Sequence, residues 1–208
     1  MPINQLVQYC NEQHSRDTSG RCANCPNEDG CISCLQCLDH IHRIVTHDRT
    51  YNCPNIANCY TCKYIHKYSS EIEYLLKRYV AVFRNTQLIR VCSIGCGPCS
   101  ELFGLHNFKR TNNFNFQIEY KGFDLNRIWQ PIHRKINDLF AFDTEFIYDD
   151  VFNYYQENDT LPNVLILNYL LSDILRTNTD VFLNDFINKL RGLYQKMPSS
   201  CLIVNDIN

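Results

Sequence analysis

Nine of the 13 cysteines in this chain of 208 residues lie before residue 63, and this crowding constrains the first third of the chain more than any other feature. The stretch to about residue 68 contains five histidines and few large aliphatic residues, so we expect bound metal to replace a hydrophobic core. The first 30 residues lack the apolar run of a secretion signal, and we therefore expect a cytoplasmic protein whose thiols stay reduced. Reduced and clustered cysteines favour zinc over disulfides.

Three Cys-x-x-Cys units provide most of the predicted metal ligands. Two thiolates separated by two residues can bind one ion, and two such units complete a tetrahedral site. We predict about two zinc ions, bound by Cys22, Cys25, Cys31, Cys34, Cys37, Cys53, Cys59 and Cys62. Cys10, His14 and His66 are substitutes, because Cys10 lies four residues before His14, and Cys62 lies four residues before His66. An iron–sulfur cluster on Cys31, Cys34 and Cys37 is the less favoured alternative, because the Cys-Pro of the bacterial ferredoxin motif is missing.

The charges of the chain are nearly balanced, with 20 Lys and Arg against 22 Asp and Glu. Phosphate binding by charge alone needs an excess of basic residues, so we exclude a basic nucleic-acid-binding tail. The most apolar segment, Val164 to Leu175, is interrupted by Asn168, Ser172 and Asp173. We therefore expect no membrane-spanning segment and no membrane partner.

From Ser70 onward, short apolar runs alternate with stretches of helical spacing. Helices are expected at 71–83, 100–108, 126–139 and 179–196, and strands at 88–94, 116–123, 146–148, 164–167 and 201–204. Strands that alternate with helices indicate a parallel sheet covered on both faces, which is an α/β fold. We thus expect two domains: a zinc-binding module at 1–68 and an α/β domain at 69–208.

A glycine-containing turn follows the first of these strands and precedes a helix. Gly95, Cys96, Gly97 and Pro98 form this turn, where glycines allow close approach of a ligand and the helix amides face it. Asp124 follows the next strand, where a carboxylate can accept hydrogen bonds from ribose hydroxyls. Its distance along the chain from Gly97 exceeds the roughly 20 residues expected, and we attribute the excess to an Asn-rich surface loop at 107–115.

At these residues the chain resembles the class I, Rossmann-like S-adenosylmethionine-dependent methyltransferases. The run Ile94 to Pro98 resembles their first motif, and Asn168 to Asp173 resembles their fourth. The resemblance covers about Ser70 to Asn208 and implies a doubly wound parallel sheet. It also implies S-adenosylmethionine as cofactor, bound by Gly95, Cys96, Gly97, Pro98, Asp124, Leu125, Asp149, Asp150 and Asn168. The resemblance assigns the acceptor side of the reaction to Asn168 and Tyr169.

The chain departs from this family at three points. Ser93 stands where the strand of the first motif often has an acid, and Cys99 stands where a glycine is usual. The family typically has a sixth and a seventh strand, whereas this sequence stops after the fifth. We expect a truncated chain, a partner chain that completes the fold, or a reduced fold without the last two strands.

The expected function is methyl transfer from S-adenosylmethionine to a macromolecule, RNA before protein, with a zinc module for structure or recognition. The first alternative is a non-catalytic zinc-binding interaction protein with a degenerate methyltransferase fold. A minor alternative is a radical S-adenosylmethionine enzyme, because Cys92, Cys96 and Cys99 have the spacing of its iron–sulfur ligands.

Overall fold

The computed structural model describes residues 1–14, 33–42, 50–158, 160–177, 180–197 and 200–206. The predicted ligands Cys22, Cys25 and Cys31 lie outside the described residues. The chain forms two compact units: Met1–His66 with Asn126–Phe140, and Lys67–Leu125 with Ala141–Asn208. The expected domains at 1–68 and 69–208 stay a prediction, and the first unit differs from the expected module by including 126–140.

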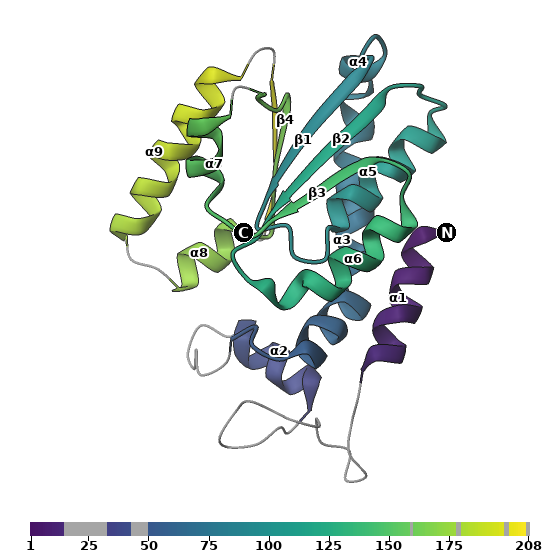
Figure 1. Cartoon of the computed structure of the whole chain (residues 1–208), viewed down its shortest axis with the longest axis vertical. Helices are drawn as coiled ribbons and strands as arrows, with labels where there is room; N and C mark the ends of the chain where they lie inside the picture. The colour runs from purple at the N-terminus through teal and green to yellow at the C-terminus, as the bar shows by residue number, and fades with distance from the viewer. Residues whose placement is uncertain (15–32, 43–49, 159, 178–179, 198–199, 207–208) are drawn as a thin grey trace. The chain divides into compact units, whose positions relative to one another are not determined.

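The second unit contains a parallel sheet of five strands in the order β3-β2-β1-β4-β5 (Figure 1). The strands are β1 Leu88–Ile94, β2 Gln117–Phe123, β3 Asp143–Ile147, β4 Val164–Asn168 and β5 Cys201–Asn205. The strand order reverses between β1 and β4, and open α/β sheets bind their ligands at the carboxyl ends of the strands at such a point. The predicted α/β class is therefore confirmed.

Helices cover both faces of this sheet, as Figure 1 shows for α5 on one face and for α7 and α9 on the other. The helices of the unit are α4 Val80–Phe83, α5 Ser100–Thr111, α7 Val151–Glu157, α8 Leu171–Thr177, α9 Asp180–Lys196 and the last part of α3, Pro54–Arg78. Gly104 allows close packing of α5 on α3, since a Cβ there would lie 2.6 Å from the Ser69 carbonyl oxygen.

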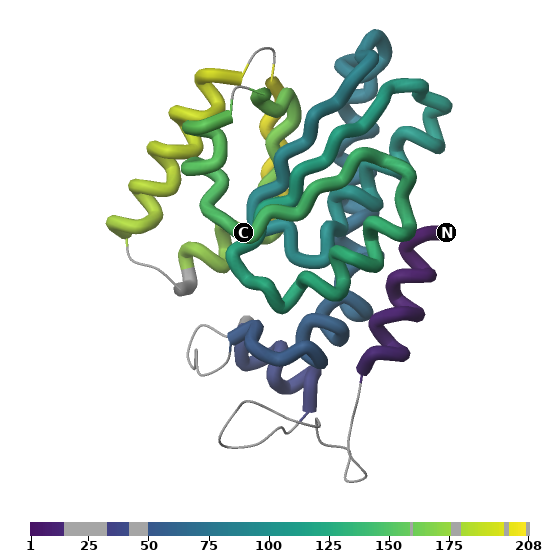
Figure 2. Tube along the Cα trace, in the orientation of Figure 1, coloured from purple at the N-terminus to yellow at the C-terminus, as the bar shows by residue number. Residues whose placement is uncertain are grey.

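A hydrophobic cluster joins the two central strands to the helices of one face. It contains Cys92 and Ile94 of β1, Leu165 and Leu167 of β4, and residues of α7, α8 and α9: Val151, Tyr155, Ile174, Phe186 and Leu193. Burial on both faces explains why β4 is apolar almost throughout. The trace in Figure 2 runs from β1 through α5 to β2, which places the glycine-containing turn at the carboxyl end of a core strand.

The first unit is helical. It contains α1 Pro2–Gln13, α2 Cys34–His42, the first part of α3, the short 3-10 helix η1 Arg127–Trp129 and α6 Gln130–Leu139. Cysteine and tyrosine take core positions there: Cys34, Cys37 and Cys53 are buried with Leu38 and Ile56. Thiols behave as small apolar groups in such a cluster.

Three sequence-based boundaries differ from the structure. The helix expected at 71–83 begins at Pro54 and ends at Arg78, with α4 as a separate turn. The third strand begins at Asp143 instead of Phe146. The Asn-rich loop expected at 107–115 is wrong in its first half, because α5 continues to Thr111 and buries Phe108.

Among the helices that the structure describes, none combines the length and apolar character needed to cross a membrane.

Candidate functional site

The turn after β1 has a backbone that only small residues adopt readily. Gly95 and Gly97 have positive φ angles of 65° and 46°. A Cβ on Gly95 would also lie 2.7 Å from Leu170 Cδ1, so glycine is required there on two grounds. Cys99, which replaces the usual glycine, has a φ of 57° and precedes α5 directly. Cys99 thus adopts the left-handed conformation although it has a side chain.

The carboxylate of Asp124 lies directly beside this turn. Asp124 Oδ2 accepts a hydrogen bond from the Gly97 amide at 2.9 Å. Two backbone bonds support this arrangement, from the Cys96 amide to the Phe123 carbonyl at 3.0 Å and from the Asp124 amide to the Ile147 carbonyl at 3.1 Å. The structure therefore brings the predicted glycine-containing turn and Asp124 together at one edge of the sheet.

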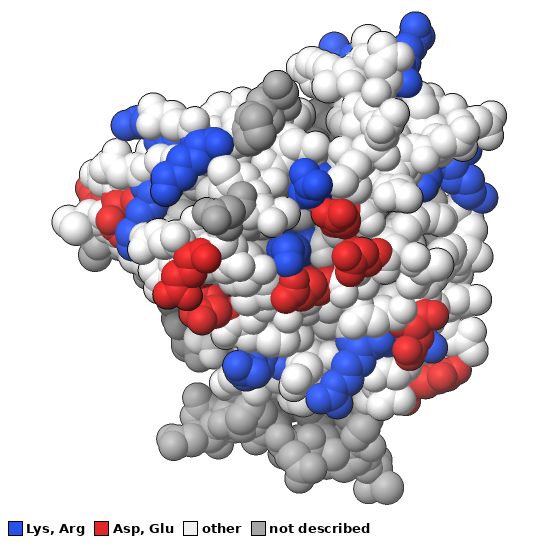
Figure 3. Space-filling model, turned by 45° about the horizontal axis from the view of Figure 1, so that its top comes forward, with Lys and Arg blue, Asp and Glu red and all other residues white. Residues whose placement is uncertain are grey.

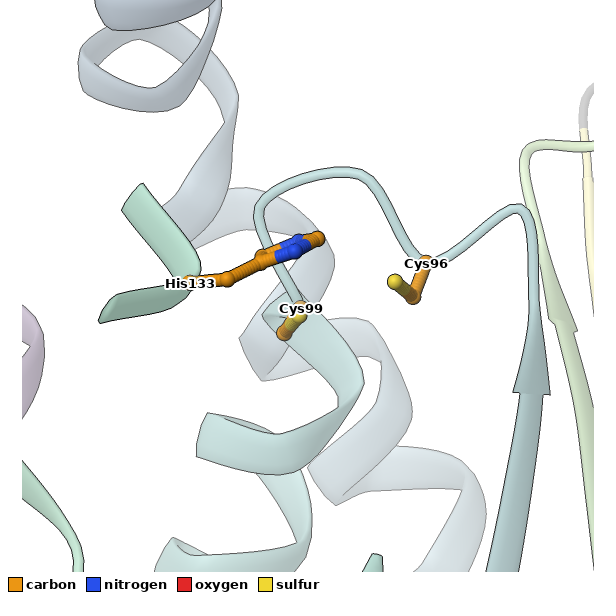
Figure 4. Close-up of side chains that lie close together, drawn as sticks. All are labelled: Cys96, Cys99 and His133. Atoms are coloured by element: carbon orange, nitrogen blue, oxygen red, sulfur yellow. The ribbon is translucent and has the colours of Figure 1, made fainter. Parts of the chain in front are cut away.

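The two thiols of the turn are buried. Figure 4 shows Cys96 on the turn and Cys99 where α5 begins; His133, also drawn there, belongs to the other unit. Burial, and then the neighbouring Cys99 thiol, raises the pKa of Cys96 well above its ordinary value. A protonated thiol is a poor nucleophile, so we do not expect Cys96 to act as a nucleophile at neutral pH.

Cys92 lies in the hydrophobic cluster and is fully buried. Burial raises the pKa of its thiol. Its place inside β1 of an open parallel sheet, among apolar side chains, does not favour an iron–sulfur cluster on Cys92, Cys96 and Cys99.

Asn168, at the end of β4, has both ends of its side-chain amide engaged. Its Nδ2 donates to Ser100 Oγ at 2.8 Å, and its Oδ1 accepts from Asn205 Nδ2 at 2.8 Å. The Asn168 amide therefore links the end of β4 to the start of α5 and to the end of β5. Its orientation is fixed by these two partners.

Tyr169, the second predicted residue of the acceptor side, has a positive φ of 57°. Its ring stacks on Tyr68 with the centroids 3.9 Å apart, and its hydroxyl donates to Glu71 Oε2 at 2.9 Å. Burial, and then the hydrogen bond to Glu71, raises the pKa of the Tyr169 phenol. Tyr169 is thus a hydrogen-bond donor that keeps its proton.

Sequence reasoning missed the carboxylate of Glu101 in the first turn of α5. It is 1% exposed, and its Oε1 accepts hydrogen bonds from Ser93 Oγ and from Tyr120 OH, each at 2.6 Å. Burial raises the pKa of Glu101, although both hydroxyls oppose the shift. The sequence signal that could have indicated a buried acceptor such as Glu101 was Ser93, a hydroxyl residue on a buried strand.

The remaining predicted cofactor residues, Leu125, Asp149 and Asp150, follow the carboxyl ends of β2 and β3. Leu125 is 76% exposed. Asp150 caps α7 by accepting from the amides of Phe152 at 2.7 Å and Asn153 at 3.2 Å. Asp149 is exposed, and its Oδ1 accepts a hydrogen bond from the Asp150 amide at 2.7 Å.

In the first unit, the substitute zinc ligands on α1 lie beside members of the predicted set. His14 Nε2 is 3.1 Å from Cys34 Sγ. The thiols of Cys10 and Cys62 are hydrogen-bonded, which raises the pKa of Cys10 and lowers the pKa of Cys62 to about 7. His66 on α3 is exposed. Thiol and imidazole groups are therefore paired across three different helices of this unit.

No protein-family model and no curated protein matches the chain. The plantazolicin methyltransferase BpumL, solved with S-adenosylhomocysteine, is a structural neighbour with a TM-score of 0.51 and 14% identity. The match covers 84% of this chain and 62% of BpumL. A putative S-adenosylmethionine-dependent methyltransferase from Methanococcus maripaludis has a TM-score of 0.48 and 13% identity, over 75% of this chain and 64% of that one.

The likeness to BpumL shows the fold alone: the chain has a Rossmann-like α/β fold, as that methyltransferase does. The chain spans less than two thirds of the length of either neighbour.

Proposed function

We propose that the chain binds S-adenosylmethionine at the carboxyl edge of its sheet and transfers the methyl group. One observation carries this proposal: the glycine turn after β1 and the carboxylate of Asp124 after β2 meet at 2.9 Å, next to the point where the strand order reverses. This is where open α/β sheets bind nucleoside ligands.

The residues at this edge fit such a cofactor. Asp124 would accept hydrogen bonds from ribose hydroxyls, and the backbone of the turn from Gly95 to Gly97 would lie against the cofactor. Asp149 would face the adenine side. When bound, the sulfonium cofactor supplies an electrophilic methyl group. The chain's own residues need only orient the acceptor and exclude water, since displacement at such a methyl needs no strong base.

Asn168 and Tyr169 would form the acceptor side of the site. Neither is free to act as a base: the Asn168 amide is engaged at both ends, and Tyr169 keeps its proton as a donor to Glu71. We therefore assign both residues to shaping the site. The acceptor would bring its own nucleophilic atom.

We further propose a macromolecular acceptor, RNA before protein, in a cytoplasmic setting. Figure 3 shows basic and acidic side chains interspersed on the displayed face of the molecule. This mixture of basic and acidic side chains does not support recognition of RNA by an excess of positive charge alone. Other contacts would therefore have to select the acceptor. The association of a cysteine-rich module with a methyltransferase fold supports the proposal.

The cysteine-rich unit would bind zinc. Its donor set fits this ion, because thiolate and imidazole are the ligands of structural zinc. The pairs His14 with Cys34 and Cys10 with Cys62 support α1 as a source of ligands, in addition to the Cys-x-x-Cys units.

Titration calorimetry with S-adenosylmethionine and S-adenosylhomocysteine tests the function. We expect micromolar binding by the parent chain and a loss of at least roughly tenfold in Asp124→Ala, because one charge-assisted hydrogen-bond partner is removed. Asp143→Ala is the matched control, since this exposed carboxylate begins β3 at the opposite edge of the sheet. Absence of binding at millimolar ligand by a folded chain would favour the non-catalytic interaction protein instead.

A further inference from the structure

Glu71 lies on α3, outside the segments Ile94 to Pro98 and Asn168 to Asp173 that resemble methyltransferase motifs. Its side chain nevertheless reaches the ends of two strands. Glu71 Oε2 accepts one hydrogen bond from the Tyr169 hydroxyl at 2.9 Å and another from Asn205 Nδ2 at 3.0 Å. One carboxylate oxygen thus ties α3 to the residue after β4 and to the last residue of β5.

The contact continues from Asn205 into the site. Asn205 Nδ2 also donates to Asn168 Oδ1 at 2.8 Å, so both hydrogens of this amide group have acceptors. Asn168 Nδ2 then donates to Ser100 Oγ at 2.8 Å. The orientation of the Asn168 amide is therefore set, through one intervening side chain, by Glu71.

Tyr169 depends on the same carboxylate. Its backbone has the left-handed conformation that residues with a side chain rarely adopt, so surrounding contacts must hold it. Those contacts are the stack on Tyr68, a hydrogen bond from the Tyr169 amide to the Asn205 carbonyl at 2.7 Å, and the bond to Glu71. Removing Glu71 leaves a phenol without its acceptor.

Two charged groups surround this contact. Lys67 Nζ lies 3.9 Å from Glu71 Oε1 and 5.5 Å from the centre of the Tyr169 ring. Asp206 acts on the Tyr169 phenol in the same direction as Glu71.

We propose that Glu71 is a positioning residue of the methyl-transfer site, which holds Tyr169 directly and Asn168 through Asn205. The inference rests on the proposed function, because it assigns these two residues to the side of the cofactor that carries the methyl group. S-adenosylhomocysteine lacks that methyl group. Loosening Tyr169 and Asn168 should therefore affect binding of the two cofactor forms differently.

The test compares Glu71→Gln with Glu73→Gln. Glu73 lies two residues further along α3 and pairs with Lys77 at 2.6 Å, so its loss removes a carboxylate from the same helix without touching the site. The first readout is the tyrosine Cζ NMR signal of Tyr169 in the ligand-free chain, assigned by its absence in Tyr169→Phe. We expect it to move in Glu71→Gln and to stay in Glu73→Gln. Glu71→Asp, which is too short to reach both partners, provides a second variant with the same expected shift.

The second readout is calorimetry with both cofactor forms. In Glu71→Gln we expect S-adenosylmethionine to bind about threefold to tenfold more weakly, while the affinity for S-adenosylhomocysteine stays within about twofold. A purely structural role would change both affinities alike. The inference is overturned if the Tyr169 signal does not move in either Glu71 variant, or if the ratio of the two affinities is unchanged. Failure of the parent chain to bind S-adenosylhomocysteine would instead overturn the proposed function. The NMR signal would still show whether Glu71 holds the Tyr169 hydroxyl.

Discussion

The carboxylate of Glu101 lies 2.6 Å from the hydroxyl of Ser93, although Ser93 stands on β1 and Glu101 in the first turn of α5. The Glu101 carboxylate, on the helix that follows the glycine turn, accepts a hydrogen bond from Ser93. Tyr120 of β2 donates to the same oxygen. Both hydrogen bonds thus converge on one buried carboxylate oxygen.

Replacing this carboxylate should destabilise the fold. In Glu101→Ala two buried hydroxyls lose their acceptor, and we expect a loss of roughly 2–4 kcal/mol in the free energy of unfolding. Urea denaturation measures the effect. Glu119→Gln is the control, because the Arg90–Glu119 pair is about 40% exposed and such pairs contribute less than about 1 kcal/mol. Equal stability of the two variants would contradict the buried role of Glu101.

Glu101 also predicts a pH dependence of stability. Burial raises the pKa of this carboxyl in the folded state above its ordinary value of 4.5, so the folded chain binds the proton more tightly than the unfolded chain. The resulting stabilisation is fully present below 4.5 and is lost as the pH rises through the folded-state pKa. Relative to Glu101→Gln, the parent chain should therefore lose unfolding free energy with rising pH above 4.5. A difference that stays constant or grows with pH would contradict this prediction.

The glycine turn gives a prediction with an internal control. Gly95→Ala should destabilise the chain by at least about 1 kcal/mol, because φ is positive there and the new Cβ would lie 2.7 Å from Leu170. Gly192→Ala in α9 should stabilise it by roughly 0.5–1 kcal/mol, since the helix gains propensity and a Cβ meets nothing within 4 Å. Thermal unfolding of both variants checks the opposite signs.

These residues show how far the sequence predicts the site. β1 was predicted to the residue, because a buried strand that ends in a glycine turn has a strong local pattern. The meeting of Gly97 and Asp124 followed from the rule that carboxyl ends of parallel strands share an edge. Glu71, Glu101 and Asn205 were missed, because their partners are remote in sequence or lie on elements whose packing has no local signal. The first part of α3 was missed because cysteine and tyrosine take the apolar positions that normally indicate a helix.

The proposed zinc content can be measured directly by elemental analysis of the purified chain. We expect about two equivalents in the parent and about one equivalent less in Cys34→Ser and in Cys62→Ser, because each removes a proposed ligand. Cys201→Ser should retain the parent content, since Cys201 lies in β5 of the other unit. Iron with visible absorbance, or equal zinc content in all three variants, would contradict the proposed ligand set.

A crystal structure of the chain with S-adenosylhomocysteine tests the central claim most directly. The account predicts the ligand at the carboxyl edge of β1 and β2, with a ribose hydroxyl within hydrogen-bonding distance of the Asp124 carboxylate and the backbone of Gly95 to Gly97 against it. A ligand bound elsewhere, or crystals that remain free of ligand at millimolar concentration, would contradict it.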